Sequence, residues 1–385
     1  MKILIQIPRL IYGGAEKVLV NFANFLVEKG HEVETLEIYE EGLLKDKFNK
    51  NIRFDAICTK EFTRENYVSL ADIKSEKNPA KLIGKLIKKL RITALGYRKQ
   101  AEKLCAERYK DKVFDLAINY LETEPPGFLL RYVKAKKFLQ WIHIDVRQIP
   151  KEDIGNYIEE YKKMDRIVCV SETSRKSMEE IFPSLGDKLT VIYNFYDTED
   201  ILKKSEEENP YDTDKIKVLS IGRFVEQKAY KRAVEIVEKL IKEGYDFCWY
   251  IIGGGGNIEE IGELIKEKGI EENVKLLGLK DNPYPYIKNC DLFFLPSKYE
   301  GFPTVTIEAK VLERPVLATM VCGIDEQIEN GKQGLICENS EKGIYEALKK
   351  ILDNPETLKE MTTNEGMAEV LENETKYEEF INILN

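Results

Sequence analysis

Residues 296–309 read PSKYEGFPTVTIEA and join a short apolar run to an amphipathic segment. The apolar run is typical of a buried strand, and Pro303 is typical of the first turn of a helix. A helix N-terminus carries partial positive charge, so the bare N–H groups from Gly301 onward suit phosphate or sugar hydroxyls. Glu300 precedes this helix and Glu308 lies within it, so one interpretation is that both carboxylates face one cleft. The alternative, which the pattern alone favours, is that Glu300 is a cap stabilised by the helix dipole.

The same succession of apolar run, turn and amphipathic segment recurs along the chain. It is typical of α/β domains, in which helices cover both faces of a parallel sheet. The expected strands are 3–7, 33–38, 54–58, 114–119, 138–142, 167–170 and 190–193, then 218–221, 247–252, 274–277, 292–295, 316–319 and 334–337. The expected helices include 15–29, 156–164, 174–182, 231–243, 258–268, 304–312 and 340–352.

A polar segment, 197–214, interrupts the alternation and is dense in Glu, Lys and Asp. We interpret it as a linker between two doubly wound, Rossmann-like domains, 1–196 and 215–367. In open parallel sheets, ligands settle outside the carboxyl ends of the strands. The fold prediction is therefore two α/β domains that face a cleft, with the chemistry in the strand-to-helix turns.

Composition excludes several classes of protein. Of 385 residues, 43% are hydrophobic and 33% are charged, which is typical of a globular chain. The net charge of −9 argues against a nucleic-acid binder. The apolar runs are too short for a membrane span or a secretion signal. The seven cysteines form no Cys-x-x-Cys pair, which argues against a zinc cluster or a disulfide framework and predicts a reducing cytosol.

Residues 81–112 carry eleven Lys or Arg against three acids. Apolar residues at helical spacing, from Leu82 to Leu90, form a stripe beside this cationic face. One interpretation is a surface helix docked on its own domain. The other is a helix that lies on an anionic membrane, where each Lys or Arg contributes about 1 kcal/mol.

Three further turns are candidate ligand sites. Gly13 and Gly14 precede the helix 15–29, where backbone amides can approach an anion. Arg223 and Lys228 follow the strand 218–221, and two such cations suit a diphosphate, although they are also typical of a solvated surface. The glycine run 253–256 is either a phosphate cradle or a permissive turn.

In combination these motifs resemble a known family. Glu300 and Glu308, eight residues apart, resemble the Glu-x7-Glu motif of the retaining glycosyltransferases of family 4, which have the GT-B fold. Four other segments match that family in the same order along the chain: Gly13-Gly14, Val170-Ser171-Glu172, Gly222–Lys228 and the glycine run after Ile252. The chain departs from the family at Ala229 and Phe195, where glycine is usual.

The resemblance implies a role for each matching residue in binding the donor. Arg223 and Lys228 would hold its diphosphate, with the amide of Gly14 closing on it from the first domain. Glu308 would hold the ribose hydroxyls. The residues that would surround the base and further parts of the donor are Leu279 and Lys280, with Gly13, Asn194 and Gly253 as additional candidates.

At the reacting sugar, the resemblance assigns Glu300, together with the backbone of Gly301, Phe302 and Pro303. His143 would lie near the reacting carbon. We expect no metal and no cofactor besides the nucleotide-sugar co-substrate. Domain 1–196, completed by a crossover helix in 368–385, would bind the acceptor, and domain 215–367 would bind the donor.

The resemblance thus implies a retaining glycosyltransferase that moves a sugar from a UDP-sugar to a hydroxyl. The expected acceptor is a lipid-linked glycan for cell-surface polysaccharide. The expected location is the cytoplasm, with peripheral contact to the inner face of an anionic membrane through residues 81–112. The alternatives are a nucleotide-sugar epimerase or phosphorylase of the same architecture, and a non-catalytic partner subunit that kept the fold.

Overall fold

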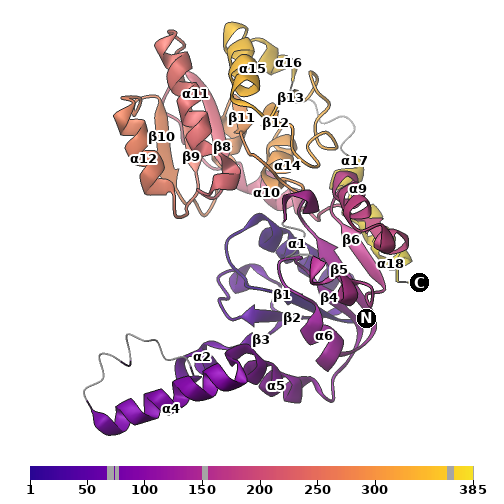
Figure 1. Ribbon diagram of the computed structural model, residues 1–385. Helices are drawn as coiled ribbons and strands as arrows, with labels where there is room; N and C mark the ends of the chain where they lie inside the picture. Colours follow the sequence, from indigo (N-terminus) through magenta and orange to yellow (C-terminus); the bar gives the residue numbers. More distant parts are fainter. Residues whose placement is uncertain (67–72, 74–77, 150–154, 362–367, 385) are drawn as a thin grey trace.

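The computed structural model describes residues 1–66, 73, 78–149, 155–361 and 368–384. The chain forms two halves, each built on one parallel β-sheet with helices packed around it (Figure 1). The halves touch directly, because Ile144 of the first forms an isolated antiparallel bridge with Gly301 of the second. The predicted α/β class with two parallel sheets is confirmed.

The N-terminal sheet has the strand order β3-β2-β1-β4-β5-β6-β7, and all of its neighbours pair in parallel. The central strand β1 is apolar and buried on both faces, as expected where helices cover a sheet on either side. The strands are β1 (Lys2–Ile7), β2 (Glu32–Tyr39), β3 (Arg53–Cys58), β4 (Val113–Asn119), β5 (Lys134–Ile142), β6 (Arg166–Cys169) and β7 (Leu189–Val191).

The C-terminal sheet has the order β10-β9-β8-β11-β12-β13, again wholly parallel. Trp249 on β9 and Phe294 on β11 are fully buried and pack ring to ring at 5.8 Å in its core. The strands are β8 (Ile216–Ile221), β9 (Phe247–Ile252), β10 (Val274–Gly278), β11 (Leu292–Leu295), β12 (Val316–Thr319) and β13 (Gly334–Cys337).

The helices of the N-terminal half are α1 (Gly14–Glu28), α2 (Lys60–Asn66), α4 (Pro79–Leu95), α5 (Tyr97–Tyr109), α6 (Gly127–Tyr132), α8 (Ile158–Tyr161) and α9 (Glu172–Ile181). Those that follow are α10 (Thr198–Lys204), α11 (Tyr230–Lys242), α12 (Ile258–Glu267), α13 (Tyr284–Asn289), α14 (Thr304–Val311), α15 (Glu341–Asp353), α16 (Thr357–Glu360), α17 (Ala368–Leu371) and α18 (Asn373–Asn382).

Helix α10 lies inside the segment predicted as a linker. Its start is capped by Asp197, whose side chain accepts a hydrogen bond from the backbone N–H of Asp200 at 2.9 Å. Ile201 is buried on its inner face. The density of charged residues masked this helix, because a single buried apolar residue is enough to orient its roughly two turns.

Helix α4 carries the basic, apolar-striped segment and extends away from the N-terminal sheet (Figure 1). Its side chains Ile83, Leu86 and Ile87 are 58, 42 and 61% exposed. The interpretation that this stripe docks on its own domain is therefore wrong for these three residues. The side chains of residues 88–95 lie outside the described ones.

The predicted crossover segment packs against the N-terminal half. Phe380 of α18 meets Phe22 of α1 edge to face, with ring centroids 5.4 Å apart. The Asn373 amide exchanges two hydrogen bonds with the backbone of Tyr196, at 3.2 and 2.7 Å. Residues 194–196, where the chain leaves the first domain, are thereby held by the C-terminal end of the described chain.

Lys376 of α18 is buried in this contact. Its ammonium donates to the carbonyls of Asn194 and Val370 at 2.8 and 2.9 Å and lies 5.2 Å from the ring of Phe195. Burial lowers the pKa of Lys376 to about 7, since no carboxylate compensates its desolvation closely and the charge of Glu379 opposes the shift only weakly.

We expect Lys376 to make stability depend on pH. Between pH 7 and its ordinary pKa of 10.5, the unfolded chain binds more protons at this residue than the folded one, so stability rises with pH. Relative to Lys376→Met, the wild type should gain up to about 1.4 kcal/mol per pH unit in this window. Urea unfolding at pH 7 and pH 9 measures the difference, and a pH-independent gap between the two proteins would contradict the assignment.

In the described part of the chain, no helix has both the length and the apolar character needed to cross a membrane. Nor do the described residues include a cluster of three or more His, Cys, Asp or Glu side chains placed to hold a metal ion.

Candidate active site

Glu300 lies in the turn between β11 and α14, and its carboxylate is nearly enclosed. It accepts hydrogen bonds from the hydroxyl of Ser297 and from Nζ of Lys228, both at 2.6 Å, and one from the amide of Gln227 at 3.3 Å. The side chains of Glu300 and Lys228 are only 8 and 14% exposed. Two residues predicted to contact different parts of a ligand therefore pair with each other.

The residue after Lys228 explains how this turn is shaped. Ala229 has φ 53° and ψ 31°, the left-handed conformation that glycine adopts easily and alanine does not. Ala229 thus stores strain of about 1 kcal/mol where the resembling family has glycine. The departure from glycine at this position therefore affects the backbone conformation as well as the size of the side chain.

Arg223 follows β8 and is exposed to the cleft. The loop that carries it stacks on the glycine run after β9, where a Cβ on Gly253 would overlap the carbonyl oxygen of Gly222. The backbone N–H of Phe224 donates to the carbonyl of Gly254 at 2.8 Å, which locks the two loops together. The glycine run therefore places Arg223 through close backbone packing.

Leu279 and Lys280 follow β10 at the same edge of the sheet. Leu279 is 71% exposed and lies against Gly254, where an added Cβ would come within 3.1 Å of its Cγ. The ammonium of Lys280 lies 5.8 Å from the ring centre of Tyr286. Leu279 and the adjacent Gly254 thus form an exposed apolar surface against which a planar ring can pack.

Helix α1 brings its N-terminus to the opposite wall of the cleft. A Cβ on Gly14 would come within 3.2 Å of the hydroxyl of Thr304, so the starts of α1 and α14 face each other. The carboxylate of Glu16 folds back over Gly13. Burial raises the pKa of Glu16, and the positive charge of Arg223 across the cleft opposes that shift.

Lys17, on the next turn of α1, crosses to the C-terminal half. Its ammonium donates to Oε1 of Glu308 on α14 at 2.5 Å. No motif singled out Lys17, because its partner lies 291 residues away in the sequence.

His143 follows β5 at the carboxyl edge of the N-terminal sheet. Its ring lies 4.7 Å from that of Tyr120, and its Nε2 has no hydrogen-bond partner among the described residues. Burial lowers the pKa of His143 to about 3, against a weaker opposing contribution from the backbone of Tyr120. The imidazole is therefore neutral at physiological pH and free to accept or donate one hydrogen bond at Nε2.

Glu122 is a buried carboxyl beside His143 that the sequence did not reveal. It accepts the backbone N–H of His143 at 2.9 Å, and burial raises its pKa. Its loop is held by Asn119, whose amide donates to the carbonyls of Leu121 and Glu124 at 3.2 and 2.9 Å. Asn119 continues a buried ladder of amides along the sheet, between Gln6 and Gln140.

Gly301 is a point of close backbone approach between the halves. A Cβ there would overlap the carbonyl oxygen of His143, so only glycine fits the bridge to Ile144. Phe302 is buried against Tyr193, with ring centroids 5.4 Å apart, and Pro303 supplies the extended residue before α14. The predicted set Glu300 to Pro303 thus meets His143 across the cleft.

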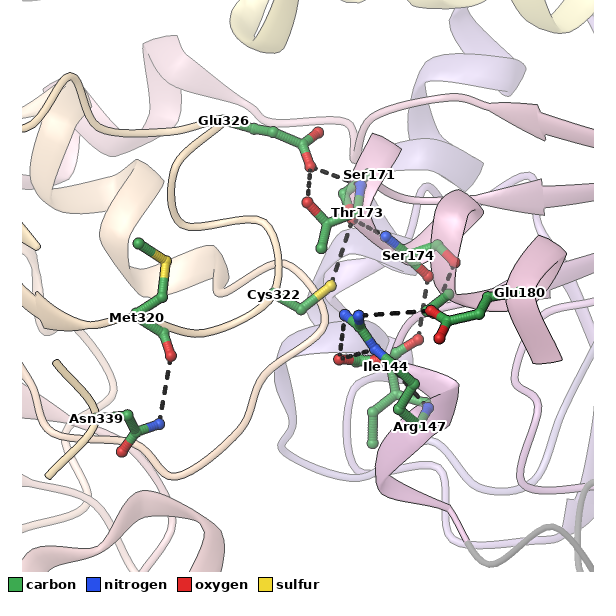
Figure 2. Close-up of polar contacts among 12 residues, drawn as sticks. Ile144, Arg147, Ser171, Thr173, Ser174, Glu180, Met320, Cys322, Glu326 and Asn339 are labelled. Carbon is green, nitrogen blue, oxygen red and sulfur yellow. Dashed lines mark hydrogen bonds and ion pairs between the residues drawn. The ribbon is translucent and has the colours of Figure 1, made fainter.

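A second contact between the halves is made by Glu326, which sequence reasoning missed (Figure 2). Its carboxylate accepts the backbone N–H groups of Glu172 and Thr173 at 2.8 Å each, and the hydroxyl of Thr173 at 2.7 Å. It therefore caps α9, where the negative charge is favoured by the helix dipole. The hydroxyl of Tyr193 also donates to it, at 3.0 Å.

A cavity of about 300 Å³ opens beside Glu300 between the halves. Asp145 and Arg147 line it from the N-terminal half, and Tyr299 and Met320 from the other. The guanidinium of Arg147 donates two hydrogen bonds of 2.9 Å to the carboxylate of Asp145. Asn194, a further candidate, instead lies at the hinge, where its carbonyl accepts from Lys376.

The sequence profile described as "Glycosyl transferases group 1" matches residues 202–381. This region contains Arg223, Lys228, Glu300 and Glu308. The C-terminal half of the chain is thus similar to the group 1 glycosyl transferases. Among its curated relatives are an uncharacterized glycosyltransferase of Methanocaldococcus jannaschii, 30% identical over 195 residues, and an N-acetylgalactosaminyltransferase of Campylobacter jejuni, 31% identical over 196 residues.

These alignments cover 48 and 50% of this chain, and 48 and 52% of the relatives. The matched segments thus span about half the length of these curated relatives. A solved structure, Anabaena HepE in complex with UDP-glucose, superposes with a TM-score of 0.75, at 15% identity and over 100% of this chain and 99% of that one. The predicted GT-B fold is confirmed by this likeness.

We expect Gly301→Ala to separate the two halves of the protein. The new methyl group would overlap the carbonyl of His143, so the bridge at Ile144 cannot form. Hydrogen exchange at Ile144 should speed up at least ~10-fold, because its backbone loses the contact.

The matched control is Gly256→Ala, since a Cβ there meets nothing within 4 Å. Equal exchange rates in the two variants would show that Gly301 does not hold the halves together.

Proposed function

We propose that the protein is a retaining glycosyltransferase that moves a sugar from a nucleoside-diphosphate donor, a UDP-sugar, to a hydroxyl of a lipid-linked glycan. The observation that carries the proposal is the convergence of cations and helix N-termini in one cleft. Arg223 and Lys228 come from the C-terminal half, and the starts of α1 and α14 face each other at Gly14 and Thr304.

The proposed reaction places negative charge where this cleft is positive. The bond between the anomeric carbon and the diphosphate breaks, the departing diphosphate gains charge, and the sugar becomes cationic. Arg223, Lys228 and the two helix ends would stabilise the leaving group without reorganising, which is electrostatic preorganisation. The acceptor oxygen forms the new bond on the same face, and its proton passes to the leaving phosphate.

In this scheme Glu300 positions the sugar and polarises its hydroxyls. Its carboxylate is held by Ser297 and Lys228, so it is an oriented acceptor of hydrogen bonds rather than a free nucleophile. The neutral imidazole of His143 would offer Nε2 to a sugar hydroxyl. Glu308 would accept the ribose hydroxyls, and Leu279 would support the base.

Two similar proteins support the choice of donor and acceptor. The structure of HepE, which shares the fold, holds UDP-glucose. The Campylobacter jejuni relative is named for an acceptor linked to diphospho-undecaprenol. Both ligands are chemically suited to the proposal, since one supplies a diphosphate leaving group and the other a lipid-linked hydroxyl.

We predict that Lys228→Ala and Glu300→Ala each lower turnover of a UDP-sugar at least ~100-fold, because each removes a group that is preorganised for the transition state. Release of UDP from a panel of UDP-sugars, with the sugar product analysed, measures this. The matched control is Lys231→Ala, a nearby lysine that is 61% exposed and paired with Glu260.

Near-normal turnover in either variant would contradict the assigned roles. An isomerised nucleotide sugar among the products would favour an epimerase. Absence of any UDP release by the wild type would favour a non-catalytic subunit.

The membrane partner of the proposed enzyme is an anionic bilayer, contacted through α4. The exposed Ile83, Leu86 and Ile87 would enter the interface, while the surrounding lysines and arginines of 81–112 meet acidic headgroups. The bilayer is favoured as occupant because the apolar stripe is bordered by charge of one sign.

We predict that the double variant Ile83→Glu with Ile87→Glu reduces binding to vesicles of phosphatidylcholine and phosphatidylglycerol in equal parts at least ~10-fold. The variant replaces two apolar side chains that would enter the bilayer with carboxylates that the anionic headgroups repel. Flotation measures it. Leu202→Glu, at a 49% exposed leucine on α10, is the control. Undiminished flotation of the double variant would contradict the contact, as would equal binding to pure phosphatidylcholine.

A further inference from the structure

The ion pair between Lys17 and Glu308 joins the two halves inside the cleft. Nζ of Lys17 lies 2.5 Å from Oε1 of Glu308 and 4.8 Å from the ring centre of Tyr284. The side chain of Glu308 is 4% exposed, whereas that of Lys17 is 40% exposed. The carboxylate is therefore the enclosed partner, and the lysine reaches it from the rim.

The charges of the pair depend on each other. Burial alone would lower the pKa of Lys17, but the charges of Glu308 and Tyr284 outweigh it and raise the pKa above its ordinary value. An enclosed carboxylate without a counterion is costly, and breaking such a pair by removing one partner is strongly unfavourable. Lys17 is thus the counterion of Glu308 while the cleft holds no ligand.

This pairing conflicts with the role proposed for Glu308. A carboxylate that accepts the ribose hydroxyls must offer oxygens to them, and Lys17 already occupies Oε1. A nucleotide whose two ribose hydroxyls each bind one oxygen of Glu308 therefore displaces the lysine from Oε1. The displaced ammonium needs a new anion, and the start of its own helix at Gly14 faces Thr304, where the diphosphate is proposed to lie.

Resting on the proposed function, we infer that Lys17 is a donor-selecting residue that exchanges partners. It neutralises Glu308 in the empty cleft and passes to the diphosphate when the nucleotide binds. Glu308 exchanges an ammonium for ribose hydroxyls in the same event, so neither charge is left unpaired.

The exchange makes the site discriminate by charge. A nucleoside has a ribose but no phosphate, so it breaks the Lys17–Glu308 pair and offers the lysine nothing. A nucleoside diphosphate breaks the same pair and supplies a new partner. Lys17 therefore disfavours the binding of uridine and favours the binding of UDP. Removing it should change the two affinities in opposite directions.

Titration of uridine and of UDP into the same protein tests this opposition. In Lys17→Met we expect uridine to bind at least ~3-fold more tightly and UDP at least ~10-fold more weakly, so the affinity ratio of UDP to uridine falls at least ~30-fold. Lys17→Gln should behave likewise, and Lys17→Arg should keep most of the ratio. Lys162→Met removes a lysine of similar exposure, paired with Glu159 at 2.7 Å, and should change neither affinity.

Each outcome bears on one claim. If the wild type binds UDP and the ratio is unchanged in both Lys17→Met and Lys17→Gln, the exchange is wrong while the proposed function stands. Equal weakening of both ligands would show that Lys17 only supports the structure. If the wild type binds no UDP, the proposed function fails, and the exchange fails with it.

Discussion

The structure depends on the neutralisation of charge across its cleft. Cations and carboxylates from both halves meet there, and its two enclosed carboxylates, Glu300 and Glu308, each pair with a lysine. Lys228 pairs with Glu300, and Lys17 pairs with Glu308. Since an enclosed charge without a partner is far more costly than a paired one, a ligand that separates either pair has to supply a replacement partner. A ligand that brings negative charge and hydroxyl groups together satisfies all of these residues at once.

The same cleft is closed by backbone contacts that are specific to their residues. Gly301 fits against His143 because it has no side chain. Glu326 of the C-terminal half caps α9 of the N-terminal half, and Asn373 of α18 donates a hydrogen bond to the backbone of Tyr196, where the chain leaves the first domain. These contacts hold the carboxyl edges of two independent sheets at a fixed separation, so side chains from distant parts of the chain act as one site.

Much of the fold could be predicted because it is local. Apolar runs and turns place most strands to within a residue or two, whereas β5 starts four residues early, at Lys134, because its first residues lie at a polar end of the strand. Short helices such as α6 and α13 were missed since they lack a full apolar period. The turns around Arg223 and Glu300 carried recognisable motifs. Lys17 and Glu326 did not, because their roles arise from partners in the other half of the chain.

A crystal structure of the protein with UDP is the most direct test of the central claim, that the cleft between the halves is built for a diphosphate. The account predicts the diphosphate against Arg223 and Lys228, with its oxygens near the amide of Gly14. An empty cleft with UDP bound elsewhere on the molecule would contradict it.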